Sequence, residues 1–174
     1  MATGTIVSLD EYLSTTYDPD REYVDGELLE RNMGEFDHSG IQGIVFAMLH
    51  SQRRQRSIHV FPELRVQVSA TRFRVPDILV TLNKGKGRIL TEPPFLCVEI
   101  LSPEDRTGRV EKKIDDYLRF GVQYVWIIDP AEKTGWSYTR EGRRESAGVL
   151  TTSNPDLALS LKEVFEALDE DVEQ

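Results

Sequence analysis

Two short apolar segments, each containing one carboxylate, constrain the fold of this 174-residue chain most strongly. They are Val75-Pro76-Asp77-Ile78-Leu79-Val80 and Cys97-Val98-Glu99-Ile100-Leu101. Each has the length and composition of a single buried β-strand. A carboxylate inside a sheet is costly unless another group compensates its charge, and two on neighbouring strands would repel each other. A divalent cation is the usual compensation, so the segments predict metal-dependent phosphodiester chemistry.

The orientation of Asp77 and Glu99 decides whether they can share an ion. Because strand side chains alternate between faces, Asp77 should share a face with Leu79, and Glu99 with Cys97. If the strands are neighbours and these faces agree, both carboxylates reach one ion, which would polarise a phosphate oxygen and lower the pKa of an attacking water. In the alternative interpretation, each carboxylate lies at a strand end and points into water.

A nuclease also needs a cation near the cleaved phosphate, and the helix predicted after the second segment can supply one. Its buried stripe consists of Val110, Ile114, Tyr117 and Leu118. At about 100° per residue, Lys113 falls beside this stripe and Lys112 falls nearly opposite it. Lys113 is therefore a candidate to lean toward the sheet, or else one more solvated charge, whereas Lys112 should face solvent.

Four further polar residues have both a functional and a structural interpretation. Glu22 could complete a metal shell, although an exposed strand glutamate is usually inert. His38 is either a loop histidine or a proton carrier at the edge of the site. Arg72 and Arg74 alternate on one strand face, where they could contact phosphates or solvent.

Turn and capping signals divide the chain into helices and strands. Ser8 opens a short helix, and Asp25-Gly26 predicts the turn of a hairpin over residues 22–30. The other predicted helices span residues 40–52 with Asp37 or Ser39 as N-cap, residues 103–120 with Ser102 as N-cap and Gly121 after the end, and residues 161–168. The other predicted strands span residues 59–69, 72–82, 95–101 and 122–129, followed by a strand containing Trp136 and Tyr138.

Composition describes an ordinary soluble globular protein, with 39% hydrophobic and 29% charged residues. The length predicts one domain over residues 1–174, with a core from about residue 7 to 165 and a frayed acidic tail over 168–174. The net charge of −9 argues against nonspecific coating of nucleic acids. No signal-peptide or membrane-spanning pattern is recognisable, and the single Cys97 lies among apolar residues, so a cytoplasmic protein is expected.

Four segments resemble the Uma2 family, which is classed with the endonucleases of the PD-(D/E)XK, or restriction-endonuclease-like, fold. They are REYVDGE at 21–27, RVPDI at 74–78, CVEILSP at 97–103 and GVQYVWIIDP at 121–130. The similarity runs from about Val7 to Phe165. It implies an α/β fold with a mixed β-sheet flanked by helices, and the predicted N-terminal helix and β-hairpin precede this sheet.

The resemblance also implies roles for individual residues. Asp77 and Glu99 take the places of the two acids that bind Mg²⁺, for which Mn²⁺ can substitute, and Glu22 matches an assisting acid on the N-terminal element. The signature lysine of the superfamily would fall at Leu101, where this chain departs from the pattern. A lysine of the following helix replaces it in this family, which points to Lys113.

The local charge around that lysine also departs from the family pattern. An aspartate often stands one turn before the helix lysine, and here Arg109 occupies that position.

The predicted function is a Mg²⁺-dependent DNA endonuclease, acting as a homodimer because two sites are needed to cut two strands. Asp77 and Glu99 would bind the metal, with Glu22 and Lys113 completing the catalytic set. One alternative is a catalytically inactive nucleic-acid-binding or oligomeric interaction module of the same fold. Another is a phosphohydrolase that acts on small phosphoesters.

Overall fold

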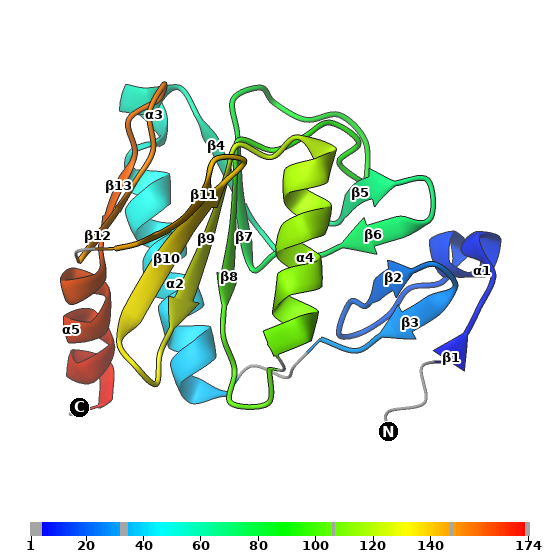
Figure 1. Cartoon of the computed structure of the whole chain (residues 1–174), viewed down its shortest axis with the longest axis horizontal. Helices are drawn as coiled ribbons and strands as arrows, with labels where there is room; N and C mark the ends of the chain where they lie inside the picture. The colour runs from blue at the N-terminus through cyan, green and yellow to red at the C-terminus, as the bar shows by residue number, and fades with distance from the viewer. Residues whose placement is uncertain (1–4, 32–34, 106, 147, 173–174) are drawn as a thin grey trace.

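The computed structural model describes residues 5–31, 35–105, 107–146 and 148–172. A larger sheet lies at its centre with helices on both faces, as Figure 1 shows. Neighbouring strands β8 and β9 run parallel, and the other neighbours are antiparallel, so the sheet is mixed as predicted. Its strands, in spatial order, are β11 (Gly142–Glu145), β10 (Thr134–Thr139), β9 (Tyr124–Asp129), β8 (Leu96–Ile100), β7 (Ile78–Thr81) and β4 (His59–Pro62).

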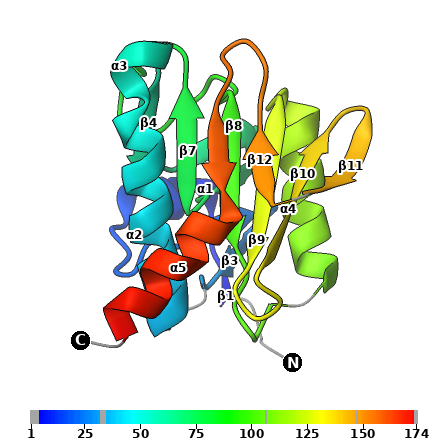
Figure 2. The ribbon, with the colours of Figure 1, turned by 90° about the vertical axis from the view of Figure 1, so that its left-hand side faces the viewer.

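Helices cover the two faces of this sheet with two separate apolar clusters. On one face lie α2 (Phe36–Ser51) and α5 (Leu161–Val172), beside the hairpin of β12 (Val149–Thr151) and β13 (Ala158–Ser160), as Figure 2 shows. A short helix, α3 (Arg53–Arg56), follows α2. On the other face, α4 (Thr107–Phe120) packs Ile114 and Tyr117 against Cys97 and Val125. Trp126 is fully buried in the first cluster, which confirms its predicted place in the core.

A smaller sheet holds the N-terminal hairpin. Its strands, in spatial order, are β1 (Thr5–Ile6), β3 (Glu27–Leu29), β2 (Glu22–Val24), β6 (Arg72–Arg74) and β5 (Val66–Ser69). Asp25 (φ 51°) and Gly26 (φ 100°) form the predicted two-residue turn. Helix α1 (Leu9–Ser14), capped by the Ser8 side chain as predicted, stacks the ring of Tyr12 on that of Tyr23 with centroids 4.9 Å apart.

The predicted strands 59–69 and 72–82 are wrong as continuous elements. Each splits in two, with β4 and β7 pairing in the larger sheet and β5 and β6 pairing in the smaller one. Glu63 has a positive φ of 49°, and Pro76 has no N–H to donate to a ladder, so the chain turns from one sheet to the other near these residues. The turn at Pro76 places Asp77 immediately before β7, where the two sheets meet.

The start of helix α2 and the end of helix α5 differ from the prediction. Helix α2 starts at Phe36 with Glu35 as N-cap, so Asp37 and Ser39 lie within the helix instead of capping it. Helix α5 continues to Val172, so most of the acidic segment predicted to fray is helical. A helix carried this far buries Leu168 against the core.

Helix α4 starts at Thr107, four residues later than the predicted start at Pro103. The reason lies in a tight turn, in which the Asp105 carboxylate accepts a hydrogen bond from the Ser102 N–H at 2.8 Å and the Asp105 N–H donates to the Ser102 carbonyl at 2.9 Å. The predicted end is confirmed, because Gly121 follows the helix with a φ of 115°.

Candidate functional site

Asp77 and Glu99 lie side by side at the ends of neighbouring strands. Strands β7 and β8 are antiparallel, and Leu79 stands opposite Cys97, so the predicted faces agree. The Ile100 N–H donates to Asp77 Oδ2 at 2.8 Å, which fixes the aspartate against β8. Only 5% of Asp77 and 7% of Glu99 is exposed, so neither carboxylate points freely into water.

Both carboxylates line a small cavity of about 40 Å³. This volume accommodates about one water-sized species. The cavity lies at the carboxyl end of β8, where ligand sites in α/β sheets are commonly found. Its lining residues are Arg31, His38, Asp77, Glu99, Ile100, Leu101, Ser102, Asp105, Arg109, Val110 and Lys113.

Lys113 reaches this cavity from α4, as the helical periodicity predicted. Its Nζ lies 2.6 Å from Glu99 Oε2 and 3.1 Å from Glu22 Oε1. Ile114 on the same helix is buried, whereas Lys112 is exposed on the opposite side. The ammonium group thus bridges two glutamates that come from different sheets.

Glu22 is fully buried, so the expectation of an exposed strand glutamate is wrong for this residue. It accepts hydrogen bonds from the Val75 N–H at 3.1 Å and from Arg74 Nη1 at 3.0 Å. Burial alone would raise the pKa of Glu22, but Lys113, Arg74 and the Val75 N–H together lower this pKa from 4.5 to about 2. Glu22 therefore remains a carboxylate that holds Lys113.

Glu99 is in the opposite electrostatic situation. It accepts a hydrogen bond from the Tyr117 hydroxyl at 2.6 Å in addition to its contact with Lys113. Burial and the nearby charges of Asp77 and Glu22 raise the pKa of Glu99 to about 7, although Lys113 opposes this rise. The pKa of Lys113 is raised, because the attraction of the carboxylates outweighs burial. Lys113 is thus a permanent cation, and Glu99 lacks full compensation of its charge.

Asp77 is neutralised by two side chains from the segment before and at the start of α2. Arg31 Nη2 lies 3.0 Å from Asp77 Oδ1, and His38 Nε2 lies 3.4 Å from Asp77 Oδ2. Burial would raise the pKa of Asp77, but the contacts with His38, Lys113 and the Ile100 N–H lower it below its usual value. His38 is therefore a residue of the site edge, located in a helix instead of a loop.

The strand arginines are engaged in ion pairs and not free for phosphates. Arg74, 2% exposed, donates to Asp116 Oδ2 at 2.7 Å and to Glu22, while Arg72 binds Asp25 and Asp116. These pairs join β6 of the smaller sheet to α4. They also hold Glu22 and Lys113 close together, because Glu22 lies in the smaller sheet and Lys113 lies on α4.

Several site residues were not recognised from the sequence. Arg31 follows the N-terminal hairpin without any motif, and Asp116 looks like one more polar position of an amphipathic helix. Tyr117 was recognised as a core residue, but its hydroxyl contact with Glu99 was not. Arg109, which stands where the family often has an aspartate, lines the cavity and donates a hydrogen bond to the Glu30 carbonyl.

The buried Glu22 predicts a specific loss of stability in acid. Because its folded pKa is about 2 and its ordinary value is 4.5, the stabilisation is complete above pH 4.5 and is lost as the pH falls toward 2. The shift corresponds to about 3 kcal/mol of unfolding free energy. Urea unfolding between pH about 5 and about 3 should show a shallower loss of stability in Glu22→Gln than in the wild type.

Glu27→Gln is the matched control, since Glu27 is exposed on the neighbouring strand of the same hairpin. This variant should retain the pH dependence of the wild type. A Glu22→Gln protein with the wild-type pH dependence would contradict the assignment.

Two general features of the described residues bear on ligands and location. None of the helices in the described ranges is long and apolar enough to cross a membrane. Within those ranges, no three His, Cys, Asp or Glu side chains gather as a set of metal ligands. The carboxylates that line the small cavity and could hold a metal are Asp77, Glu99 and Asp105, and the first two face each other across neighbouring strands. This donor set fits Mg²⁺, which is usually bound through one or two carboxylates and keeps several waters.

Comparison with known proteins identifies relatives of this fold. A nuclease-fold crystal structure from Anabaena variabilis ATCC 29413, described as a putative nuclease belonging to DUF820, superposes with a TM-score of 0.83. The two sequences are 30% identical, and the match covers 93% of this chain and 99% of the other. No curated protein matches the chain at a significant level. The model of the Uma2 family, described as "Putative restriction endonuclease", matches residues 9–173, and the chain belongs to this family.

Proposed function

We propose that this protein is a Mg²⁺-dependent endonuclease that hydrolyses phosphodiester bonds in DNA. The observation that carries the proposal is that Lys113, which bridges Glu99 and Glu22, lines one small cavity together with Asp77 and Glu99. The family description and the description of the Anabaena relative both name nucleases, which supports the same chemistry.

Asp77 and Glu99 would hold the metal. Asp77 is already fixed by the Ile100 N–H and also contacts Arg31 and His38. Glu99 carries a raised pKa of about 7 because its charge is incompletely compensated. A bound Mg²⁺ supplies the missing positive charge, polarises the phosphate and lowers the pKa of the attacking water.

Lys113 would stabilise the charge that develops on the phosphate. Because its pKa is raised, it remains protonated and cannot act as a general base. A fixed ammonium group aimed at the reacting phosphate stabilises the additional negative charge of the transition state. The oxygen of a water molecule would form the new bond to phosphorus while that water gives up a proton to solvent. The bond to the leaving oxygen would break, and the leaving oxygen would take up a proton from solvent.

The test is a titration of purified protein with Mg²⁺ and Mn²⁺ in the presence of supercoiled plasmid DNA. We expect nicking and linearisation that require the metal and stop when EDTA removes it. Calorimetry should show Mg²⁺ binding to the wild type and its loss in Asp77→Asn, which keeps the shape of the side chain. Asp115→Asn, at an exposed position of α4, should behave as the wild type.

Other results would favour the alternatives. Hydrolysis of small phosphoesters without any cleavage of DNA would indicate a phosphohydrolase. Metal binding and hydrolysis that are both absent would leave an interaction module of the same fold. A homodimer is proposed with the nuclease, and sedimentation of the protein with and without duplex DNA tests it.

A further inference from the structure

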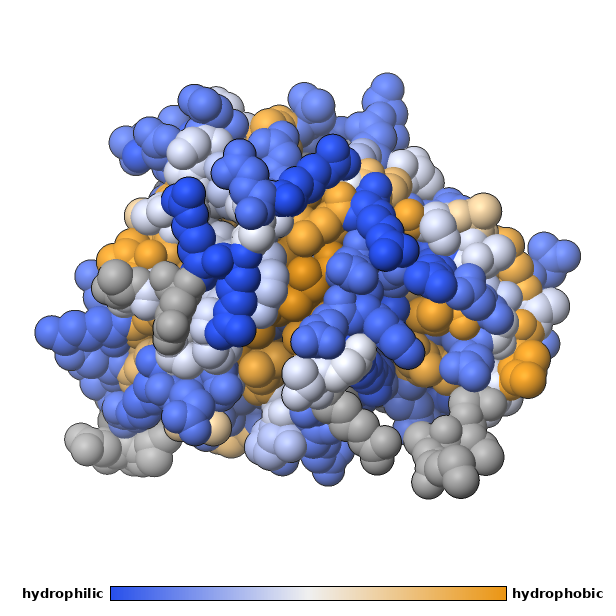
Figure 3. Space-filling model, in the orientation of Figure 1, coloured by the Kyte–Doolittle hydropathy of each residue, from blue (hydrophilic) through white to orange (hydrophobic). Residues whose placement is uncertain are grey.

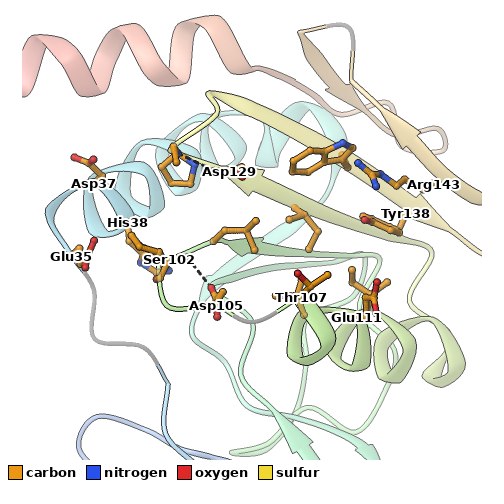
Figure 4. Close-up of a pocket in the computed structure, with 18 residues that line it drawn as sticks. Glu35, Asp37, His38, Ser102, Asp105, Thr107, Glu111, Asp129, Tyr138 and Arg143 are labelled. Carbon is orange, nitrogen blue, oxygen red and sulfur yellow. Dashed lines mark hydrogen bonds between the residues drawn. The ribbon is translucent and has the colours of Figure 1, made fainter.

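A larger groove opens next to the carboxylate cavity, between α4 and strands β9 and β10 (Figure 4). Its volume is about 480 Å³, in the usual range of about 300–1,000 Å³ for small-ligand sites. Five residues line both spaces: His38, Leu101, Ser102, Asp105 and Val110. The groove therefore shares a wall with the proposed catalytic cavity.

One end of the groove is lined by aromatic side chains. Trp136 and Tyr138 lie on β10, and the guanidinium carbon of Arg143 on β11 lies 4.8 Å from the Trp136 ring centroid and 6.0 Å from that of Tyr138. Ile114 and Ile127 continue the apolar wall. Figure 3 shows hydrophobic side chains in a central strip flanked by hydrophilic ones on both sides. Such a surface suits a planar, uncharged ring.

Three buried polar atoms along this groove have no hydrogen-bond partner among the residues that the structure describes: His38 Nδ1, Ser102 Oγ and Trp136 Nε1. His38 and Ser102 are each only 8% exposed. Buried polar atoms are usually paired, so these three leave hydrogen-bonding capacity just behind the groove wall, which a side-chain rotation would turn toward a ligand. A nucleobase edge has donors and acceptors of its own.

Charge separates the two spaces. The small cavity has three cations, Arg31, Arg109 and Lys113, beside its acids Asp77, Glu99 and Asp105. The groove is lined by acids, with Glu35, Asp37 and Glu111 among them, and Arg143 lies at its aromatic end. A phosphate is therefore favoured beside the cations of the cavity and disfavoured along the groove. An uncharged ring attached to that phosphate is the part of a nucleotide that fits the groove.

We propose that the groove binds one unstacked nucleobase of single-stranded DNA, next to the phosphodiester that is cleaved. The base stacks against the aromatic end of the groove, formed by Trp136, Tyr138 and Arg143. A base inside a duplex is stacked and paired, so it cannot enter without being extruded. This inference rests on the proposed nuclease function and adds a preference for unpaired substrate.

The test compares two fluorescein-labelled single-stranded oligonucleotides of equal length by fluorescence anisotropy, with Ca²⁺ in place of Mg²⁺ to prevent cleavage. One carries normal bases and the other has abasic sugars with the same phosphates. The wild type should bind the base-bearing strand about 10-fold more tightly, since the abasic strand has no base to stack on an aromatic side chain. Trp136→Ala and Arg143→Ala should lose most of this preference and change binding of the abasic strand little.

Two control variants separate stacking from charge and from folding. Arg144→Ala removes the same charge from the next residue of β11, whose side chain points to the other face of the strand. It should affect both oligonucleotides equally. Trp136→Phe keeps a stacking ring and should keep most of the preference. Arg143 is exposed, so its variant remains informative if Trp136→Ala does not fold.

The inference is overturned if the wild type binds both strands equally or binds neither. It is also overturned if Arg143→Ala and Arg144→Ala have the same effect on both strands. Cleavage of plasmid DNA, measured in parallel with Mg²⁺, separates the two proposals. A protein that cuts DNA without any preference for bases would retain the nuclease function and lose the nucleobase site.

Discussion

Lys113→Ala should lower the rate of DNA cleavage by about 10²–10³-fold, whereas Lys112→Ala should leave the rate unchanged. The two lysines are adjacent in α4 and carry the same charge. Only Lys113 reaches the cavity, with its Nζ 2.6 Å from Glu99. Removal of a fixed cation from the site removes stabilisation of the transition state. Removal of an exposed cation changes only a weak, solvent-screened electrostatic interaction with the site. Single-turnover cleavage at saturating Mg²⁺ measures the effect.

The Lys113 variant must be separated from an unfolded protein. Without the ammonium group, Glu22 loses one cation and Glu99 loses its ion pair, so some destabilisation is expected. Circular dichroism and urea unfolding should show a folded variant under the assay conditions. Lys113→Arg, which keeps the charge, should retain more activity than Lys113→Ala. Equal rates for the wild type and a folded Lys113→Ala protein would remove Lys113 from the proposed mechanism.

Arg74→Ala should destabilise the protein by about 3–5 kcal/mol, because it removes a buried cation that pairs with two buried carboxylates. Arg74 binds Asp116 through two nitrogens, at 2.9 and 2.7 Å, and Glu22 through a third at 3.0 Å. All three side chains are at most 7% exposed. Urea unfolding of the wild type and variant near neutral pH measures the difference in free energy.

Arg72→Ala is the matched control for this change. Arg72 lies two residues away on β6 and also binds Asp116, but its side chain is 37% exposed. Solvent screens such a pair, so its removal should cost about 1 kcal/mol or less. Equal destabilisation of the two variants would contradict the proposal that the buried ion pairs of Arg74 join the smaller sheet to α4.

Local sequence patterns determined much of the architecture. The apolar runs identified β8 and β9, and the helical periodicity of α4 correctly separated Lys113 from Lys112. The predicted turn at Asp25-Gly26 and the predicted helix cap at Ser8 were also confirmed. In each case the signal lies within a few residues, where backbone geometry and solvent exposure of one element suffice to fix the structure.

Other features were decided only by the tertiary structure. The runs 59–69 and 72–82 look like single strands, yet each is divided between two sheets, because the pairing partners lie elsewhere in the chain. Likewise, Arg31 reaches Asp77 across 46 positions, and Arg74 reaches Glu22 across 52. The sequence by itself identified as candidates the acids and the lysine that the fold brings together. Only the fold decided how their charges are neutralised, because burial and Coulomb energy depend on distance in space.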